Sequence, residues 1–184
     1  DTESRIPGEK LCYAVNQKLP EDIRVLESEE VPLDWHPRKQ NSVKTYEYRI
    51  LNCRISVPTR RLYAHFCYYS LDVEKMRQGA AYLLGEHDFK SFCSNKRMKK
   101  STVRRIDQIG IHADGTKVVF TYTGNGFLYN MVRILTGTLL EVGLGKRRPE
   151  EMKAVLEARN REAAGATAPP EGLFLMQVEY DGEA

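Results

Sequence analysis

The sequence lacks long uninterrupted apolar runs. Runs such as residues 80–84 are far shorter than the roughly 18 to 20 residues that a membrane-spanning helix needs. Glycine and proline total 21 of 184 residues and are spread along the chain, which excludes collagen-like and low-complexity classes. With 41% hydrophobic and 29% charged residues, the composition is that of an ordinary globular protein. The length allows one domain with a sizeable core.

Cysteine is scarce, and no two cysteines have the close spacing of a metal-binding pair. The four cysteines stand at positions 12, 53, 67 and 93, with no Cys-x-x-Cys pair, and the four histidines are not at zinc-finger spacing. We therefore expect no metal site. The first residues carry no secretory signal pattern, and scattered thiols indicate a reduced, cytoplasmic location.

Several catalytic patterns are missing as well. We find no Ser–His–Asp order, no paired carboxylates at catalytic spacing and no phosphate-binding glycine loop. The chain starts with Asp1 rather than methionine, and we expect it to be a part of a longer protein. Catalytic residues supplied by the rest of that protein would then be absent from this sequence.

Basic residues are concentrated in two segments of a chain whose net charge is only +3. Residues 38–61 hold seven bases and one acid, and residues 92–105 hold six bases and no acid. This distribution predicts a one-sided positive face for an anionic partner, with plain solvated surface as the alternative.

Hydrophobic periodicity predicts an α+β fold in which helices pack on one face of a mostly antiparallel sheet. No linker divides the chain, so residues 1–184 are expected to form a single domain. The expected helices cover residues 9–19, 72–84, 127–142 and 149–161, with a turn or short helix at 87–92. The expected strands cover residues 23–31, 42–54, 63–69, 102–112, 117–123 and 173–180, and Asp114-Gly115 marks a hairpin.

Arg133 is the only charge in the apolar segment 118–140. A guanidinium cannot lose its charge, because its pKa is above roughly 12. It must therefore meet an anion or several carbonyls, or else extend along the helix to the surface. Glu141 is a poor partner, because it lies eight residues away, about 12 Å along a helix. Gly137, one turn after Arg133, is interpreted either as a site of close packing or as a tolerated helix glycine.

Aromatic and basic side chains share one face of the strand expected over residues 42–54. Tyr46 and Tyr48 are two residues apart, as are Lys44 and Tyr46. A tyrosine on a basic sheet suits stacking on an RNA base, although a half-buried core aromatic gives the same pattern. His36 lies before Arg38 in a loop that enters the basic strand, and it is interpreted either as a catalyst or as a hydrogen-bonded surface or core residue. Lys96 and Arg97 belong to a basic cluster that suits phosphates, with a solvated loop as the alternative.

Residues 126–143 closely resemble the arginine-containing core helix of TruA-type tRNA pseudouridine synthases. Five further motifs occur in the order that this family shows, so the resemblance covers nearly the whole chain; they are residues 19–23, 35–38, 44–48, 87–92 and 167–173. The resemblance implies isomerisation of uridine to pseudouridine in the anticodon stem-loop of tRNA, without metal or organic cofactor, by an enzyme that is a homodimer at full length.

The resemblance also implies roles for single residues. Arg133 matches the arginine that pairs with the catalytic aspartate, and Tyr46 matches the tyrosine that packs on the target base and serves in proton removal. Leu128 lines the uracil pocket, and His36 and Arg38 lie on the RNA-facing loop. The family's nucleophilic aspartate belongs to an Arg-Thr-Asp motif that this sequence does not contain. We therefore expect the chain alone to be inactive.

Two other classes of function fit the same residues. One is a non-catalytic RNA-binding module that uses a basic sheet and stacked tyrosines. The other is a protein-interaction domain whose basic segments are ordinary surface. Arg133 discriminates between the enzyme and the RNA-binding module, because a pure binding module has no need of a buried arginine that points into a pocket. Tight, salt-dependent tRNA binding by the longer protein would exclude the protein-interaction domain.

Overall fold

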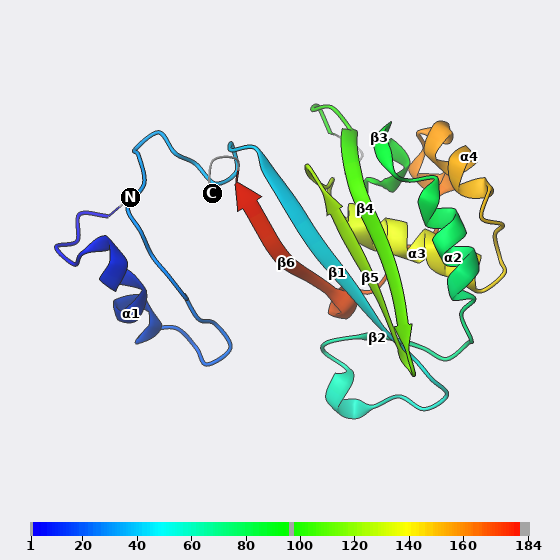
Figure 1. Ribbon diagram of the computed structural model, residues 1–184, viewed down its shortest axis with the longest axis horizontal. Helices are drawn as coiled ribbons and strands as arrows, with labels where there is room; N and C mark the ends of the chain where they lie inside the picture. The colour runs from blue at the N-terminus through cyan, green and yellow to red at the C-terminus, as the bar shows by residue number, and fades with distance from the viewer. Residues whose placement is uncertain (1, 96–97, 181–184) are drawn as a thin grey trace. The chain divides into compact units, whose positions relative to one another are not determined.

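The computed structural model describes residues 2–95 and 98–180. The chain forms two compact units, Asp1–Gln40 and Asn41–Ala184, and each is described here by itself (Figure 1). The single domain expected over residues 1–184 stays a prediction, because two compact units can belong to one domain. Among the described residues, no helix is both long and apolar enough to cross a membrane.

The first unit contains one short helix and no strand among its described residues. A 3-10 turn, η1 (Gly8–Lys10), leads into α1 (Leu11–Asn16), which confirms the predicted helix. The strand predicted over residues 23–31 is wrong. The Asn16 side chain explains why this segment stays irregular: its amide donates to the Val25 carbonyl at 2.7 Å, and its oxygen accepts from the Val25 N–H at 2.8 Å. A side chain thus satisfies the backbone that a neighbouring strand would otherwise bind.

The second unit contains a six-stranded sheet. Five strands lie in the order β2-β1-β5-β4-β3, and β6 also pairs with β1. Every pair is antiparallel except β1 with β2, which confirms the mostly antiparallel α+β prediction. The strands are β1 (Ser42–Asn52), β2 (His65–Cys67), β3 (Gly85–Asp88), β4 (Val103–Asp114), β5 (Lys117–Gly124) and β6 (Leu173–Tyr180).

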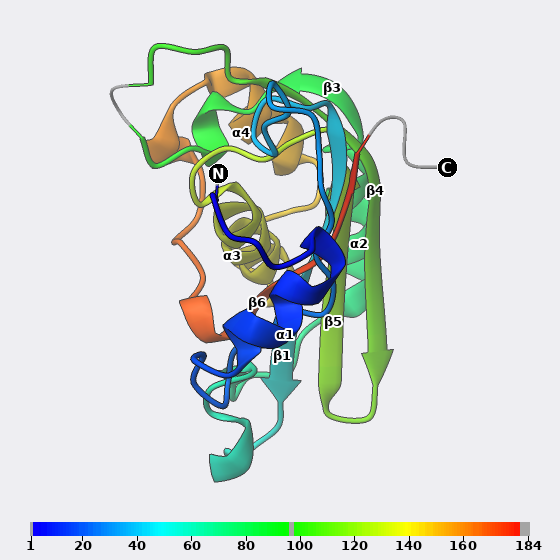
Figure 2. The same cartoon turned by 90° about the vertical axis from the view of Figure 1, so that its left-hand side faces the viewer.

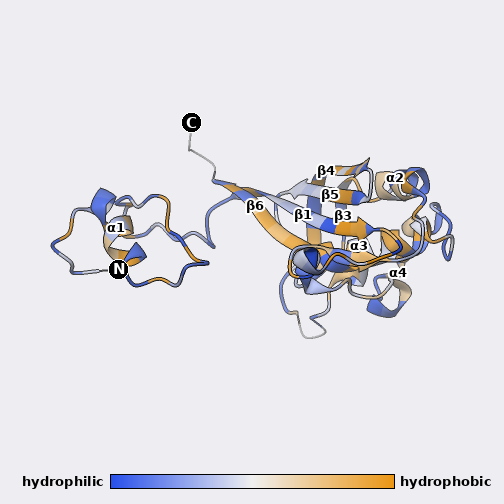
Figure 3. Ribbon diagram, turned by 90° about the horizontal axis from the view of Figure 1, so that it is seen from below, coloured by the Kyte–Doolittle hydropathy of each residue, from blue (hydrophilic) through white to orange (hydrophobic). Residues whose placement is uncertain are grey.

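Three helices build the core against this sheet: α2 (Val73–Ala81), α3 (Met131–Gly143) and α4 (Glu151–Ala158). In Figure 2, α3 lies to one side of strands β1, β5 and β4. Tyr48, Phe120 and Ile111 face one another across β1, β5 and β4 and are all buried in the same cluster as α3. Buried and less buried residues alternate along β5, and orange and blue bands are visible on β4 and β5 in Figure 3.

The boundaries of several predicted elements differ from the observed ones. Helix α3 begins at Met131 rather than Phe127, because Asn130 adopts a left-handed conformation (φ 60°) that a helix cannot contain. Helix α4 ends at Ala158 because Arg159 is also left-handed (φ 48°). Strand β3 was not expected; it exists because residues 85–88 pair with the first part of β4.

The first basic segment is spread over both ends of the sheet, since Lys44 and the start of β4 both lie beside Gly124. Strands β1 and β4 run parallel to each other, since each is antiparallel to β5. Lys99 and Lys100 precede β4 and therefore lie at the end of the sheet where β1 begins. Arg60 and Arg61 follow β1 and lie at the opposite end. The sheet thus separates charges that the sequence groups into one class.

Candidate active site

Arg133 lies in the first turn of α3 and is partly buried. Its Nε donates to the carbonyl of Ala168 at 2.7 Å, and its Nη1 donates to the side-chain oxygen of Asn130 at 3.2 Å. Two protein acceptors therefore fix the guanidinium plane. The side chain is neither free in solvent nor sealed in the core.

Both acceptors of Arg133 are neutral. None of the ion pairs among the described residues involves Arg133. Glu141 pairs with Arg147 instead, at 3.1 Å, in line with the expectation that Glu141 is a poor partner for Arg133. Among the described residues Arg133 therefore has no ion-pair partner, and the positive end of the α3 dipole adds to its charge. This position favours an anion.

The segment 164–169 holds Arg133 in place. The Ala168 N–H donates to the Arg133 carbonyl at 3.0 Å, so Ala168 binds both the backbone and the side chain of Arg133. The Tyr48 hydroxyl donates to the Pro169 carbonyl at 2.7 Å, which ties the same segment to β1. The sequence indicated part of this segment only as a motif of the family resemblance, over residues 167–173, and this role was missed.

Gly137 explains how the segment can approach α3 so closely. A Cβ at this position would lie 1.8 Å from the Ala166 carbonyl oxygen, which no side chain can tolerate. Of the two interpretations of Gly137, close packing is the correct one. Because Gly137 lies one turn after Arg133, the same contact helps to place Ala168 beside the guanidinium.

Asn130 is a further residue that sequence reasoning missed. Its amide nitrogen donates to Ser94 Oγ at 2.9 Å while its oxygen accepts from Arg133. The side chain thus connects Arg133 to the segment after the 3-10 turn η3 (Lys90–Phe92). The available signal was the asparagine itself, since it is among the few residues that adopt left-handed conformations readily.

Tyr46 packs against the turn that joins β5 to α3, and Leu128 lies in that turn. The Tyr46 ring packs edge-on against Phe127, with centroids 5.1 Å apart and an interplanar angle of 79°. Leu128 follows Phe127 and is buried, and its carbonyl accepts from the Met131 N–H at 3.0 Å. Burial raises the pKa of Tyr46, so its hydroxyl keeps its proton at neutral pH. Tyr46 thus lies against the turn that contains Leu128, and this turn leads directly into the first turn of α3, where Arg133 lies.

The remaining predicted site residues fare differently. Lys44 lies two residues before Tyr46 on the same face of β1, and its ammonium donates to Ser42. His36 and Arg38 lie in an exposed loop of the first unit, where the Arg38 N–H donates to His36 Nδ1 at 3.1 Å. Their contribution to the site stays a prediction. Lys96 and Arg97 lie outside the described residues.

Comparison with known proteins gives a consistent result. Residues 80–181 match the family model described as tRNA pseudouridine synthase. The chain is 47% identical to tRNA pseudouridine synthase A of Halalkalibacterium halodurans, over 95% of this chain and 66% of that protein. It is 44% identical to the protein of the same name from Acetivibrio thermocellus, over 97% of this chain and 73% of that protein. It is 48% identical to tRNA pseudouridine synthase A of Bacillus pumilus, over 98% of this chain and 73% of that protein.

Proposed function

Because the chain belongs to the tRNA pseudouridine synthase family, an isomerase family, we propose that it forms the arginine-bearing part of an active site that converts uridine to pseudouridine in the anticodon stem-loop of tRNA. One observation carries the proposal: the guanidinium of Arg133 is fixed by two neutral acceptors and has no ion-pair partner among the described residues. The reaction needs an ionised carboxylate, and this is the group that such a charge stabilises.

The carboxylate comes from outside the described residues. The chain spans about two thirds to three quarters of the length of the relatives named above, which leaves room in such proteins for a further segment. An aspartate docked on Arg133 gains a charge-assisted hydrogen bond and the favourable helix dipole, and both lower its pKa. It is then ionised, and nucleophilic, at neutral pH.

The reaction proceeds by rearrangement within one nucleotide. The target base leaves the stack, at a cost of a few kcal/mol that phosphate and stacking contacts offset. The aspartate attacks either the uracil or the ribose, the bond from N1 to C1′ breaks, the base turns, and a bond from C5 to C1′ forms while the bond to the aspartate breaks. The proton on C5 must then leave, and N1 takes up a proton from water, so that the product is an isomer of uridine. Tyr46, which is a neutral phenol, relays the C5 proton by accepting it as it releases its own to water.

A pseudouridine assay on tRNA tests this proposal. The chain alone is expected to form no pseudouridine, while the chain preceded by the upstream sequence of its gene is expected to be active. In that longer protein, Arg133→Ala is expected to lower kcat/KM at least 100-fold, because the aspartate loses its partner. Pseudouridine formation by the chain alone would contradict the claim that the chain lacks the nucleophile. If the longer protein forms no pseudouridine, the proposed function is wrong.

The longer protein is also expected to be a cytoplasmic homodimer. Sedimentation analysis checks the dimer, and a fluorescent fusion checks the location. The four cysteines of the chain are free, which suits a reduced compartment.

A non-catalytic RNA-binding module is the second candidate, favoured by exposed tyrosines and arginines after β1. Under that alternative, Arg133→Ala weakens tRNA binding as much as Arg38→Ala does, and the longer protein forms no pseudouridine. Under our proposal, Arg133→Ala affects turnover far more than binding.

A further inference from the structure

The stretch between Glu47 and Asp72 contains no acidic residue but carries four arginines. Three of them, Arg54, Arg60 and Arg61, lie between β1 and β2 and are exposed. None of these three forms an ion pair with any described residue. Three exposed cations with no neutralising neighbour create a local positive potential at this end of the sheet.

Aromatic side chains are interspersed with these cations. Tyr63, Tyr68 and Tyr69 are 57%, 55% and 67% exposed. The rings of Tyr68 and Tyr69 meet edge to face, with centroids 5.3 Å apart. We name the six residues together the arginine–tyrosine surface: Arg54, Arg60, Arg61, Tyr63, Tyr68 and Tyr69. Its combination of positive charge and open ring faces is typical of proteins that bind single-stranded or looped RNA.

The sheet holds this surface in place. The Asn52 amide donates to the carbonyls of Cys67 and Tyr69, at 2.9 and 2.7 Å, so the segment carrying the tyrosines is tied to the end of β1. A hollow of about 320 Å³ lies between Arg54, Tyr68 and Tyr69. This volume is at the lower end of the roughly 300–1,000 Å³ that small ligands occupy, so it can admit a nucleotide.

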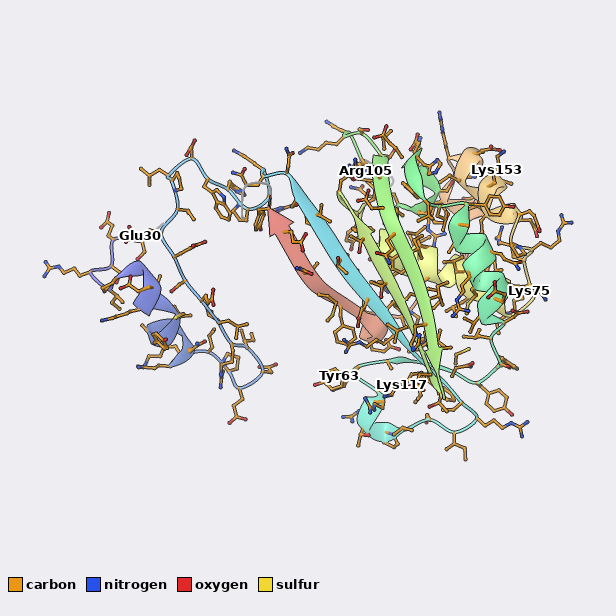
Figure 4. All side chains as sticks on the ribbon, viewed as in Figure 1. Glu30, Tyr63, Lys75, Arg105, Lys117 and Lys153 are labelled. Carbon is orange, nitrogen blue, oxygen red and sulfur yellow. The ribbon has the colours of Figure 1, made fainter. Side chains whose placement is uncertain are left out.

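A second, smaller hollow extends the surface onto the sheet. It has a volume of about 90 Å³, and its lining includes Arg49, Arg60, Tyr63 and Lys117. Figure 4 shows Tyr63 and Lys117 close to each other at the end of the sheet where β1 ends. Lys117 thus adds a cation beside Arg60, whereas the charge of Arg49 is paired with Glu47 at 2.8 Å.

We propose that the arginine–tyrosine surface is a second RNA contact, separate from the site around Arg133 and Tyr46. Its arginines bind phosphates, and its tyrosines stack on unpaired bases. Tyr46 and Asn52 are six residues apart on β1, which corresponds to about 20 Å. An RNA that reaches both sites must therefore be larger than the target nucleotide and its neighbours. The proposal rests on the proposed function only in taking this RNA to be tRNA.

Charge favours RNA over a second copy of the chain as the occupant. Self-association through a two-fold interface brings each patch against its own copy. The unpaired arginines of the two copies would then face one another, with no acid in the stretch to separate them. A polyanion meets the same cations with opposite charge, and release of its counterions adds to binding.

Binding of fluorescent tRNA to the chain tests the proposal without any need for turnover. Arg60→Glu/Arg61→Glu is expected to weaken binding at least tenfold and to reduce the slope of log K against log salt by about two. Tyr63→Ala and Tyr69→Ala are each expected to weaken it about tenfold with little change in that slope. Lys153→Glu is the control for charge reversal elsewhere on the surface: Lys153 is exposed on α4, one charge is reversed where the double variant reverses two, and binding is expected to stay within twofold.

The outcomes separate this proposal from the proposed function. The proposal of a second contact is overturned if the arginine and tyrosine variants keep their tRNA affinity, or if the chain shows no measurable tRNA binding. Neither result bears on the role of Arg133 in turnover, which the pseudouridine assay tests separately. A change in sedimentation rather than in tRNA affinity assigns the surface to a second copy and likewise overturns the proposal. Weakened binding in a longer protein that forms no pseudouridine supports the surface and rejects the function.

Discussion

At the scale of single residues, the nature of the acceptors around Arg133 decides what the arginine can do. A carboxylate among its own neighbours would neutralise the guanidinium, and an incoming aspartate would gain little from it. The structure provides an amide oxygen and a backbone carbonyl instead, from Asn130 and Ala168. These groups orient the guanidinium without neutralising it.

Asn130→Asp tests this argument in the longer, active protein. The new carboxylate takes the place of an oxygen that already lies 3.2 Å from Arg133 Nη1, so it forms an internal ion pair and competes with the catalytic aspartate. We expect kcat/KM to fall at least tenfold. The acid limb of the pH profile should move to higher pH, because an aspartate that shares its arginine has a higher pKa.

Asn130→Gly is the matched control for this experiment. Glycine adopts the left-handed conformation of position 130 at no steric cost and adds no charge. Its acid limb should stay where the unmodified protein has it. An equal shift of the limb in both variants would show that Asn130 acts only through local folding.

At the scale of elements, the site depends on the contact between α3 and the segment 164–169. Gly137→Ala places a methyl group against the Ala166 carbonyl, so the segment must move away from the helix. We expect a loss of about 1–3 kcal/mol in the free energy of unfolding, as for other overpacked sites. Urea denaturation measures this loss. Activity of the longer protein should fall as well, because Ala168 no longer orients Arg133.

Gly110→Ala is the control for that substitution. A Cβ at position 110, on β4, would lie 3.8 Å from Thr121, which is an ordinary contact. The change should alter stability by less than about 0.5 kcal/mol. If both alanine variants unfold at the same urea concentration, close packing at Gly137 is not important for stability.

At the scale of the whole molecule, buried tyrosines make the second unit sensitive to alkali. Burial raises the pKa of Tyr46, Tyr48 and Tyr122 above the usual value of 10. The unfolded chain therefore loses these protons at a lower pH than the folded one. The stability that the neutral phenols contribute is complete below pH 10 and is lost as the pH rises through the folded pKa values.

Urea denaturation at pH 8, 10 and 11 checks this prediction. Above pH 10 each buried tyrosine should lower the free energy of unfolding by up to about 1.4 kcal/mol per pH unit. Tyr122→Phe removes one such group, and with it the hydrogen bond to Thr136, so it should be less stable at pH 8 but lose less stability between pH 10 and 11. Parallel losses in both proteins would mean that Tyr122 ionises normally in the folded state.

Sequence periodicity was sufficient for elements that carry their own signal. The alternation in residues 42–52 predicted β1, Asp114-Gly115 predicted the β4–β5 hairpin, and Asp72 caps α2 through the Lys75 N–H at 3.0 Å. It failed for residues 23–31, where a single asparagine side chain binds the backbone, and for residues 85–88, whose strand exists only because β4 lies beside it. Pairing partners are not encoded locally.

By itself, the sequence determined that Arg133 is a permanent charge in an apolar helix and that its motifs resemble one enzyme family. Only the tertiary structure decided which groups surround that charge. Ala168 is 35 residues away along the chain, and it reaches Arg133 because Gly137 admits its segment. The structure likewise placed Arg60 and Arg61 at the opposite end of the sheet from Lys99 and Lys100. The reason is the same in both cases: local preferences set the conformation of a segment, whereas long-range packing sets its neighbours, and the neighbours decide whether a charge is neutralised or left to bind a substrate.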